Sequence, residues 1–80
     1  MTIAFVLINT EIGAEEEVLQ KLKEIPEVIE AYVIYGVYDV LAKISADDMS
    51  RLKEIVTKSI RRMSKVRSTL TMIVVEGFSR

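Results

Sequence analysis

Residues 2–8 read TIAFVLI, and this short run decides the fold more than any other stretch of the chain. It is rich in β-branched and aromatic side chains, it is too short for an ordinary helix, and Asn9 and Gly13 follow it, so it predicts a strand. The run is apolar on both faces. One face carries Ile3, Phe5 and Leu7, and the other carries Ala4, Val6 and Ile8.

The segment that follows changes to a helical period. An apolar stripe recurs there at the spacing of one helix face, on Ala14, Val18, Leu22 and Ile25. Three glutamates, residues 15–17, occupy the first turn, where the helix dipole favours negative charge. Pro26 ends the element, so the sequence predicts a helix over residues 14–23.

The rest of the chain repeats this alternation. Residues 28–34 and 40–44 predict two strands separated by a loop, and residues 66–75 predict a fourth strand. Between them, Ser45 followed by Asp48 resembles a capping box that opens a helix running to about Arg62. The order β-α-β-β-α-β predicts an α+β, ferredoxin-like fold, in which both helices cover one face of a four-stranded antiparallel sheet.

Composition limits the classes of protein open to this chain. Its 80 residues form a single domain, residues 1–80, with no cysteine and no histidine, which excludes disulfides, thiolate metal sites and a histidine base. No metal or other cofactor is expected. The longest apolar run spans six residues, so we expect no membrane segment and a cytoplasmic location. Scarce side-chain amides and abundant Lys, Arg and Glu are typical of thermophilic proteins.

Two helices can cover only one face of the sheet, yet the first and last strands are apolar on both faces. A bare second face would be a larger apolar patch than soluble monomers usually expose. We therefore expect a homodimer built through the open sheet face, which a charge at Val6 should disrupt. The alternative is that edges and loops wrap over that face.

Charge is unevenly distributed along the chain. Residues 1–30 carry seven acidic and two basic side chains, whereas residues 51–80 carry eight basic and two acidic ones. The basic cluster at residues 58–67 resembles a nucleic-acid footprint. However, the net charge is −1 and no aromatic residue interleaves with the cluster. Complementing the helix dipole explains it better, and we expect no direct DNA binding.

One loop stands out as a candidate site. Residues 35–39 place two tyrosines and a carboxylate around Gly36, where backbone can approach a ligand. Asp39 can accept hydrogen bonds from an ammonium group. The last strand adds the hydroxyls of Ser68, Thr69 and Thr71. An ordinary hairpin loop explains the first feature at least as well, and an ordinary Thr-rich strand explains the second better, because Thr is common in strands.

Three segments resemble the effector-binding (RAM) domain of the Lrp/AsnC feast/famine regulators. They are residues 26–31 (PEVIEA), 36–44 (GVYDVLAKI) and 66–74 (VRSTLTMIV), and the resemblance covers nearly the whole chain. It implies a ferredoxin-like domain that dimerises through its sheets, assembles into rings of dimers and binds free amino acids between dimers. Tyr35 departs from the family pattern, in which a small hydroxyl residue precedes the glycine.

The resemblance also implies site residues. The ligand loop matches Gly36, Tyr38 and Asp39, and hydroxyls of the same site match Ser68, Thr69 and Thr71. Asp39 would hold the ammonium group of an amino acid, and backbone N–H groups near Gly36 would hold its carboxylate. The family's helix-turn-helix domain is missing before the first strand, so we expect a stand-alone form of the sensor.

The resulting expectation is a non-enzymatic sensor and assembly module. It would bind a free amino acid, form a homodimer and a higher oligomer of dimers, and modulate full-length Lrp/AsnC regulators by co-assembly. The alternative is a small dimeric ferredoxin-like barrel enzyme of the cofactor-free oxygenase or isomerase type. That class needs a polar group in a pocket between sheet and helices, and the apolar stripes offer none. An RNA-binding version of the fold expects exposed aromatics on the central strands, and only Phe5 qualifies.

Overall fold

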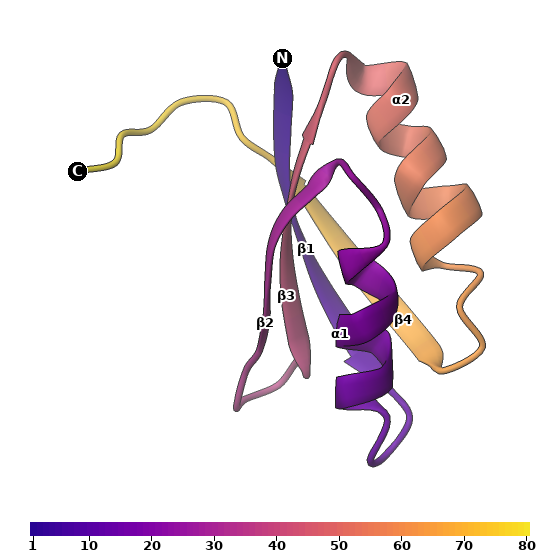
Figure 1. Ribbon diagram of the computed structural model, residues 1–80. Helices are drawn as coiled ribbons and strands as arrows, with labels where there is room; N and C mark the ends of the chain where they lie inside the picture. Colours follow the sequence, from indigo (N-terminus) through magenta and orange to yellow (C-terminus); the bar gives the residue numbers. More distant parts are fainter.

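The computed structural model describes all 80 residues and confirms the expected order of elements (Figure 1). The strands are β1 (Thr2–Thr10), β2 (Val28–Val33), β3 (Val40–Ala46) and β4 (Val66–Ile73). The helices are α1 (Glu15–Lys23), α2 (Met49–Glu54) and a π-helical continuation of α2, η1 (Ile55–Ile60). All strand pairs are antiparallel, in the order β2-β3-β1-β4, and the helices lie on one side of the sheet.

The register decides which face of the sheet the helices cover. Ala4, Val6 and Ile8 of β1 are fully buried beneath the helices. The alternating set, Ile3, Phe5 and Leu7, lies on the other, open face and is only half-buried. The predicted two-sided character of β1 is confirmed, but a charge at Val6 would enter the core and not the open face.

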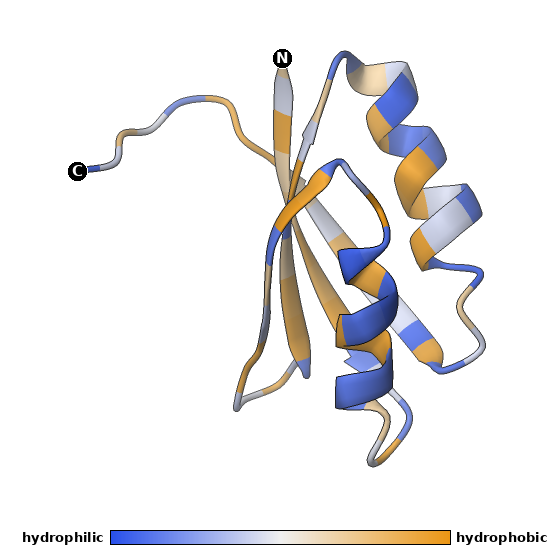
Figure 2. Cartoon of the chain, in the orientation of Figure 1, coloured by the Kyte–Doolittle hydropathy of each residue, from blue (hydrophilic) through white to orange (hydrophobic).

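The core is a cluster of 13 buried apolar residues between the sheet and the helices. Its members are Ala4, Val6, Ile8, Val18, Leu22, Val40, Ala42, Ile44, Ala46, Leu52, Ile55, Val56 and Ile60. Figure 2 shows hydrophobic and hydrophilic bands along each helix, as expected for helices that pack one side against a sheet. The stripe predicted for α1 is confirmed, since Val18 and Leu22 are fully buried and Ala14 nearly so.

The second helix begins later than predicted. Ser45 is not its cap but a residue of β3, paired with Ile3, and the hydroxyl oxygen is buried without a partner. The strand continues because buried Ala46 keeps its alternation. Asp48 caps the helix instead, and its Oδ1 accepts a 2.8 Å hydrogen bond from the Arg51 N–H.

The second helix also ends differently. After Glu54 it widens into the π-helix η1, which closes with a 2.9 Å bond from the Arg61 N–H to the Val56 carbonyl, and it stops at Ile60 and not at Arg62. The last strand ends at Ile73, two residues earlier than predicted. The Val74 N–H still donates a 2.8 Å hydrogen bond to the Ile3 carbonyl, and the residues after it form an arm that stands away from the body (Figure 1).

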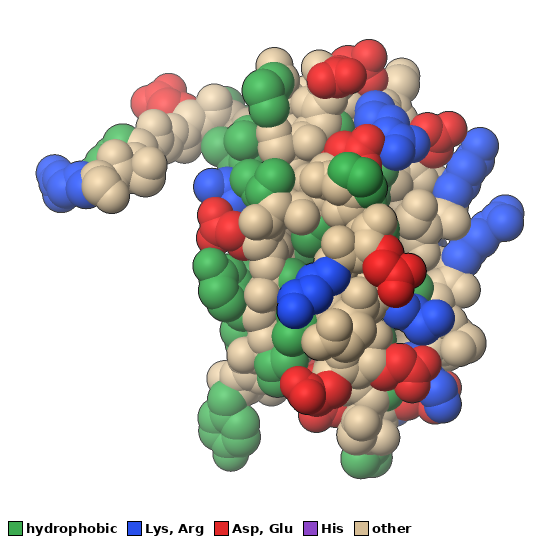
Figure 3. Space-filling model, in the orientation of Figure 1, with side chains coloured by type: hydrophobic (Ala, Val, Ile, Leu, Met, Phe, Trp, Pro, Cys, Tyr) green, Lys and Arg blue, Asp and Glu red, His purple; other side chains and the backbone are tan.

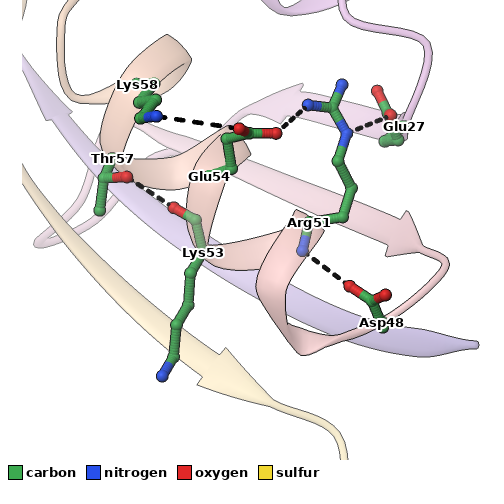
Figure 4. Close-up of polar contacts among 7 residues, drawn as sticks. All are labelled: Glu27, Asp48, Arg51, Lys53, Glu54, Thr57 and Lys58. Atoms are coloured by element: carbon green, nitrogen blue, oxygen red, sulfur yellow. Dashed lines mark hydrogen bonds and ion pairs between the residues drawn. The ribbon is translucent and has the colours of Figure 1, made fainter.

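Arg51 links the turn before β2 to the second helix (Figure 4). Its Nε lies 2.8 Å from a Glu27 oxygen, and its Nη1 lies 2.7 Å from Glu54, which also pairs with Lys58 at 3.8 Å. The hydrogen bond from Arg51 holds the pKa of Glu27 below its ordinary value of 4.5 and raises that of Arg51. A carboxylate with a lowered pKa stabilises the fold at pH values above its unfolded pKa.

Arg51→Gln should therefore flatten the acid dependence of stability. In the parent, the contribution of Glu27 is present above its unfolded pKa and is lost as pH falls through the lowered folded pKa, so the free energy of unfolding should fall between about pH 5 and 3. In Arg51→Gln the free energy of unfolding should fall less steeply over the same pH range, as measured by urea denaturation at each pH. The control is Lys53→Gln, whose ammonium group makes no ion pair. A parent-like slope in Arg51→Gln would contradict the assignment.

Candidate functional site

The polar residues of the sheet gather at one end. Strand β1 runs antiparallel to both neighbours, so its last residues lie beside the first residues of β3 and β4. Asn9 pairs with Ser68 of β4, and its Nδ2 donates a 3.2 Å hydrogen bond to the serine hydroxyl. On the other side of β1, Asp39 immediately precedes β3. Asn9 and Ser68 are 59 positions apart in the chain, and Thr10 and Asp39 are 29 apart, yet both pairs meet at this end of the sheet.

Asp39 is tied to the end of β1 by its main chain and its side chain. Its N–H donates to the Ile8 carbonyl at 3.0 Å, and its own carbonyl accepts from the Ile34 N–H at 2.9 Å. Its Oδ2 accepts a 2.8 Å hydrogen bond from the Thr10 N–H and lies 3.5 Å from the Thr10 hydroxyl. Its other oxygen, Oδ1, has no hydrogen-bond partner within the chain.

A depression of about 500 Å³ opens over this end of the sheet. It is lined by Asn9, Thr10, Glu11, Ile12, Glu15, Asp39, Arg67 and Ser68. We call it the Asp39 cavity. With three carboxylates and one guanidinium group in its wall, it favours a ligand that carries a positive group. No cluster of acidic side chains in the chain has the geometry to hold a metal ion.

The open face of the sheet is a second candidate surface. Its apolar side chains are Ile3, Phe5, Leu7, Tyr32, Leu41, Leu70 and Met72, which share one face by register. Figure 3 shows hydrophobic side chains gathered on the side away from the helices. Leu70 and Met72 are 45% and 41% exposed in the single chain.

None of the helices has the length and apolar character needed to cross a membrane.

Comparison with known proteins places the chain in a family. The model of the family described as "Lrp/AsnC ligand binding domain" matches residues 3–80. The chain belongs to the Lrp/AsnC ligand-binding domain family. The resemblance seen in the sequence is thereby confirmed.

Solved structures and curated proteins that resemble this chain agree with this assignment. The crystal structure of FFRP-DM1 is 44% identical, with a TM-score of 0.91, and the match covers 94% of this chain and 100% of that one. The HTH-type transcriptional regulator FL11 of Pyrococcus furiosus is 34% identical over 74 residues, 92% of this chain and 48% of the regulator. The chain thus spans about half the length of the curated Lrp/AsnC regulators that it matches.

Two further matches are more distant or more partial. A transcriptional regulator of Neisseria meningitidis, solved as an L-Met complex, shares the Lrp/AsnC fold with a TM-score of 0.89 at 18% identity, and the match covers 99% of this chain and 53% of that one. Homocitrate synthase of Sulfurisphaera tokodaii is 41% identical over 59 residues, which is 74% of this chain but only 13% of the enzyme. The curated relatives matched over most of this chain are otherwise named as transcriptional regulators.

In the single Lrp/AsnC chain, the six predicted site residues do not line one common cavity. Asp39 and Ser68 line the Asp39 cavity, whereas Gly36 and Tyr38 do not. Thr69 and Thr71 pair with Ile8 and Val6, so they lie on the helix side of the sheet, opposite to Ser68. Thr71 lines a separate groove of about 400 Å³ beside the second helix.

Gly36 has no structural requirement for glycine within the chain. Its backbone does not adopt a positive φ, and a Cβ placed on it would meet no atom within 4 Å. Any need for glycine at this position must come from a ligand or from a neighbouring chain.

Six of the eight residues that line the cavity were not predicted as site residues, and three of them show what signal the sequence carried. Asn9 had a signal, because it is a polar residue at the end of a strand that is otherwise apolar. Thr10 had none, since its role as the partner of Asp39 depends on strand register. Arg67 stands where that register shifts, which no sequence pattern reveals.

The hydrogen bond between Thr10 and Asp39 can be tested through stability. Thr10 is only 5% exposed, so Asp39→Ala would leave its N–H buried without an acceptor, at a cost of about 1–3 kcal/mol. Asp39→Asn keeps an acceptor oxygen and should cost less. Chemical denaturation of both variants measures the difference. Equal stabilities for Asp39→Ala and the parent would show that this bond contributes nothing.

Proposed function

We propose that this chain is an amino-acid-binding sensor whose site is completed when copies assemble. The observation that carries the proposal is the free Oδ1 of Asp39 in the wall of an acidic cavity. Asp39 binds the ammonium group of the ligand, and the polar side chains of Asn9 and Ser68 orient it. The L-Met complex of the Neisseria regulator, which shares the fold, supports an amino acid as the class of ligand.

The remaining predicted residues join the site from outside the single-chain cavity. Gly36 is fully open to solvent, as are the side chains of Tyr35 and Val37 on either side of it. We place this loop at the contact between dimers, where its backbone N–H groups bind the ligand's carboxylate and Tyr38 walls the pocket. Thr69 and Thr71 contribute hydroxyls at the same contact. The ligand then stabilises the assembled state by its higher affinity for that state.

Co-assembly is the regulatory part of the proposal. The curated relatives are regulators about twice as long as the part of them that this chain matches. A chain that presents the same sheet face and the same loop can enter the assemblies of such regulators and alter their response to amino acids.

The enzyme alternative lacks a suitable pocket. A ferredoxin-like barrel enzyme needs polar groups in a cavity between sheet and helices. Here 13 packed apolar residues occupy most of that space, and the groove of about 400 Å³ beside the second helix has only Lys53, Thr57 and Thr71 as polar lining residues. The match to homocitrate synthase covers too little of that enzyme to carry its activity over.

Asp39→Asn separates ligand binding from folding. A thermal-shift screen against the twenty amino acids identifies a ligand for the parent, and calorimetry then compares variants. Loss of a charge-assisted hydrogen bond, about 1.5–3 kcal/mol, predicts roughly ten- to hundredfold weaker binding to Asp39→Asn. The control is Asp47→Asn, an exposed carboxylate outside the cavity, which should bind like the parent. Unchanged affinity in Asp39→Asn, or a parent that binds no amino acid, would refute the proposal.

Leu7→Glu tests the sheet-to-sheet dimer. Burying a large aliphatic side chain contributes about 1.5–3 kcal/mol, and the open face offers several, so the parent should be a dimer or a larger oligomer in light scattering. A charge at Leu7, in the middle of that face, should yield monomers. The control is Gln20→Glu, at an exposed side chain of α1 on the helix side of the sheet and outside every cavity described above. A soluble monomeric parent would overturn this assembly.

A further inference from the structure

A second depression adjoins the Asp39 cavity, and its wall is basic. Its volume is about 270 Å³, and it is lined by Arg61, Val66, Arg67, Ser68 and Thr69. Arg67 and Ser68 line both depressions, so the two share a wall. Figure 1 shows why they meet, since the start of β4 lies at the same end of the molecule as the loop that follows β1.

Neither arginine of this basic depression has an acidic partner. The cations in ion pairs are Lys43, Arg51, Lys58 and Lys65, so no carboxylate lies within 4.0 Å of Arg61 or Arg67. Each guanidinium group carries five N–H donors that no acidic side chain of the chain satisfies. Two such groups in the wall of one depression form a donor-rich, positively charged surface.

Both arginines stand at irregularities of the backbone. Arg61 follows the π-helix and closes it through its N–H. Arg67 is the extra residue of a β-bulge, because Asn9 pairs with Ser68 and Thr10 pairs with Val66. Bulges redirect side chains, and π-helical turns are frequent at functional sites. Two independent deviations from regular structure thus bring one arginine each to the same depression.

The connection between the two arginines is held in place without a ligand. Ile60 is fully buried, and its carbonyl accepts a 3.1 Å hydrogen bond from the Met63 N–H. The Met63 carbonyl in turn accepts a 3.0 Å bond from the Val66 N–H. The backbone positions of Arg61 and Arg67 are therefore preorganised, which lowers the entropic cost of binding.

The helix dipole gives only a partial explanation. Cations near a helix C-terminus are favourable, which accounts for Arg61 and equally for its neighbour Arg62. It does not account for Arg67, which lies in a strand. It also does not distinguish Arg61, which lines the depression, from Arg62, which does not.

We propose that Arg61 and Arg67 together bind a small oxyanion. Guanidinium groups bind carboxylates and phosphates with paired hydrogen bonds. The carboxylate of a metabolite and a free phosphate share this chemistry. Arg67 and Ser68 also line the Asp39 cavity, but the oxyanion proposal does not rest on the amino-acid proposal, since Asp39 is not among its donors.

The test is a titration of the ¹⁵N-labelled protein with inorganic phosphate and, separately, with acetate at constant ionic strength. The amide signals of residues 61 and 67–69 should shift and saturate. Arg61→Gln and Arg67→Gln should each weaken binding by about tenfold or more, and Arg67→Lys should restore it only in part because it lacks the planar fork. The anion that binds more tightly identifies the source of the oxyanion.

Arg62→Gln is the matched control, since it removes one positive charge beside the depression without removing a lining residue. It should bind both anions like the parent. Asp39→Asn should not weaken phosphate binding, so failure of the amino-acid proposal and failure of this one give different results. Shifts that do not saturate, or equal weakening in Arg62→Gln and Arg67→Gln, would mean a diffuse basic surface and would overturn the site.

Discussion

The structure depends on a central strand that is apolar on both faces. Strand β1 lies between β3 and β4, and its two sets of alternating side chains each need to leave water. The helices bury one set completely. The other set stays half-buried on the open face, where the C-terminal arm borders Ile3 and Phe5 only along one groove. The proposed assembly thus follows from how β1 is built.

The same strand also determines where a site can form. An antiparallel strand brings its end next to the beginnings of both neighbours, so the polar end of β1 meets the loop before β3 and the bulge in β4. Asp39 and Arg67 lie in one cavity for this reason, although neither belongs to a local motif that includes the other. Topology, and not a contiguous sequence signature, assembles the charges of the site.

Much of the fold could be predicted because the hydrophobic period of an element and the residues that end it are local features of the sequence. The α1 stripe with Pro26 after it, and the alternation of Val40, Ala42 and Ile44, needed no tertiary information. The predicted helix start at Ser45 was wrong because Ser45 and Asp48 can both cap a helix and lie three residues apart. Burial of Ala46 extends β3 past Ser45, so Asp48 is the cap. The face of each hydroxyl in β4 depends on pairing with β1, so sequence alone grouped Ser68 with Thr69 and Thr71 although the sheet separates them.

The adjoining acidic and basic depressions give the proposed assembly a means of responding to a ligand. Their shared wall, Arg67 and Ser68, lies at the edge strand of the sheet, where a neighbouring dimer can approach. A ligand that binds more tightly when a neighbour completes the wall must, by linkage, strengthen the contact with that neighbour by the same factor. Burying a charged group at a contact between chains is costly unless an opposite charge pairs with it. This cost applies to the two arginines and to the unpartnered oxygen of Asp39. The ligands proposed for the two depressions, an ammonium group at Asp39 and an oxyanion at Arg61 and Arg67, supply those opposite charges, so ligand binding and assembly have the same requirement.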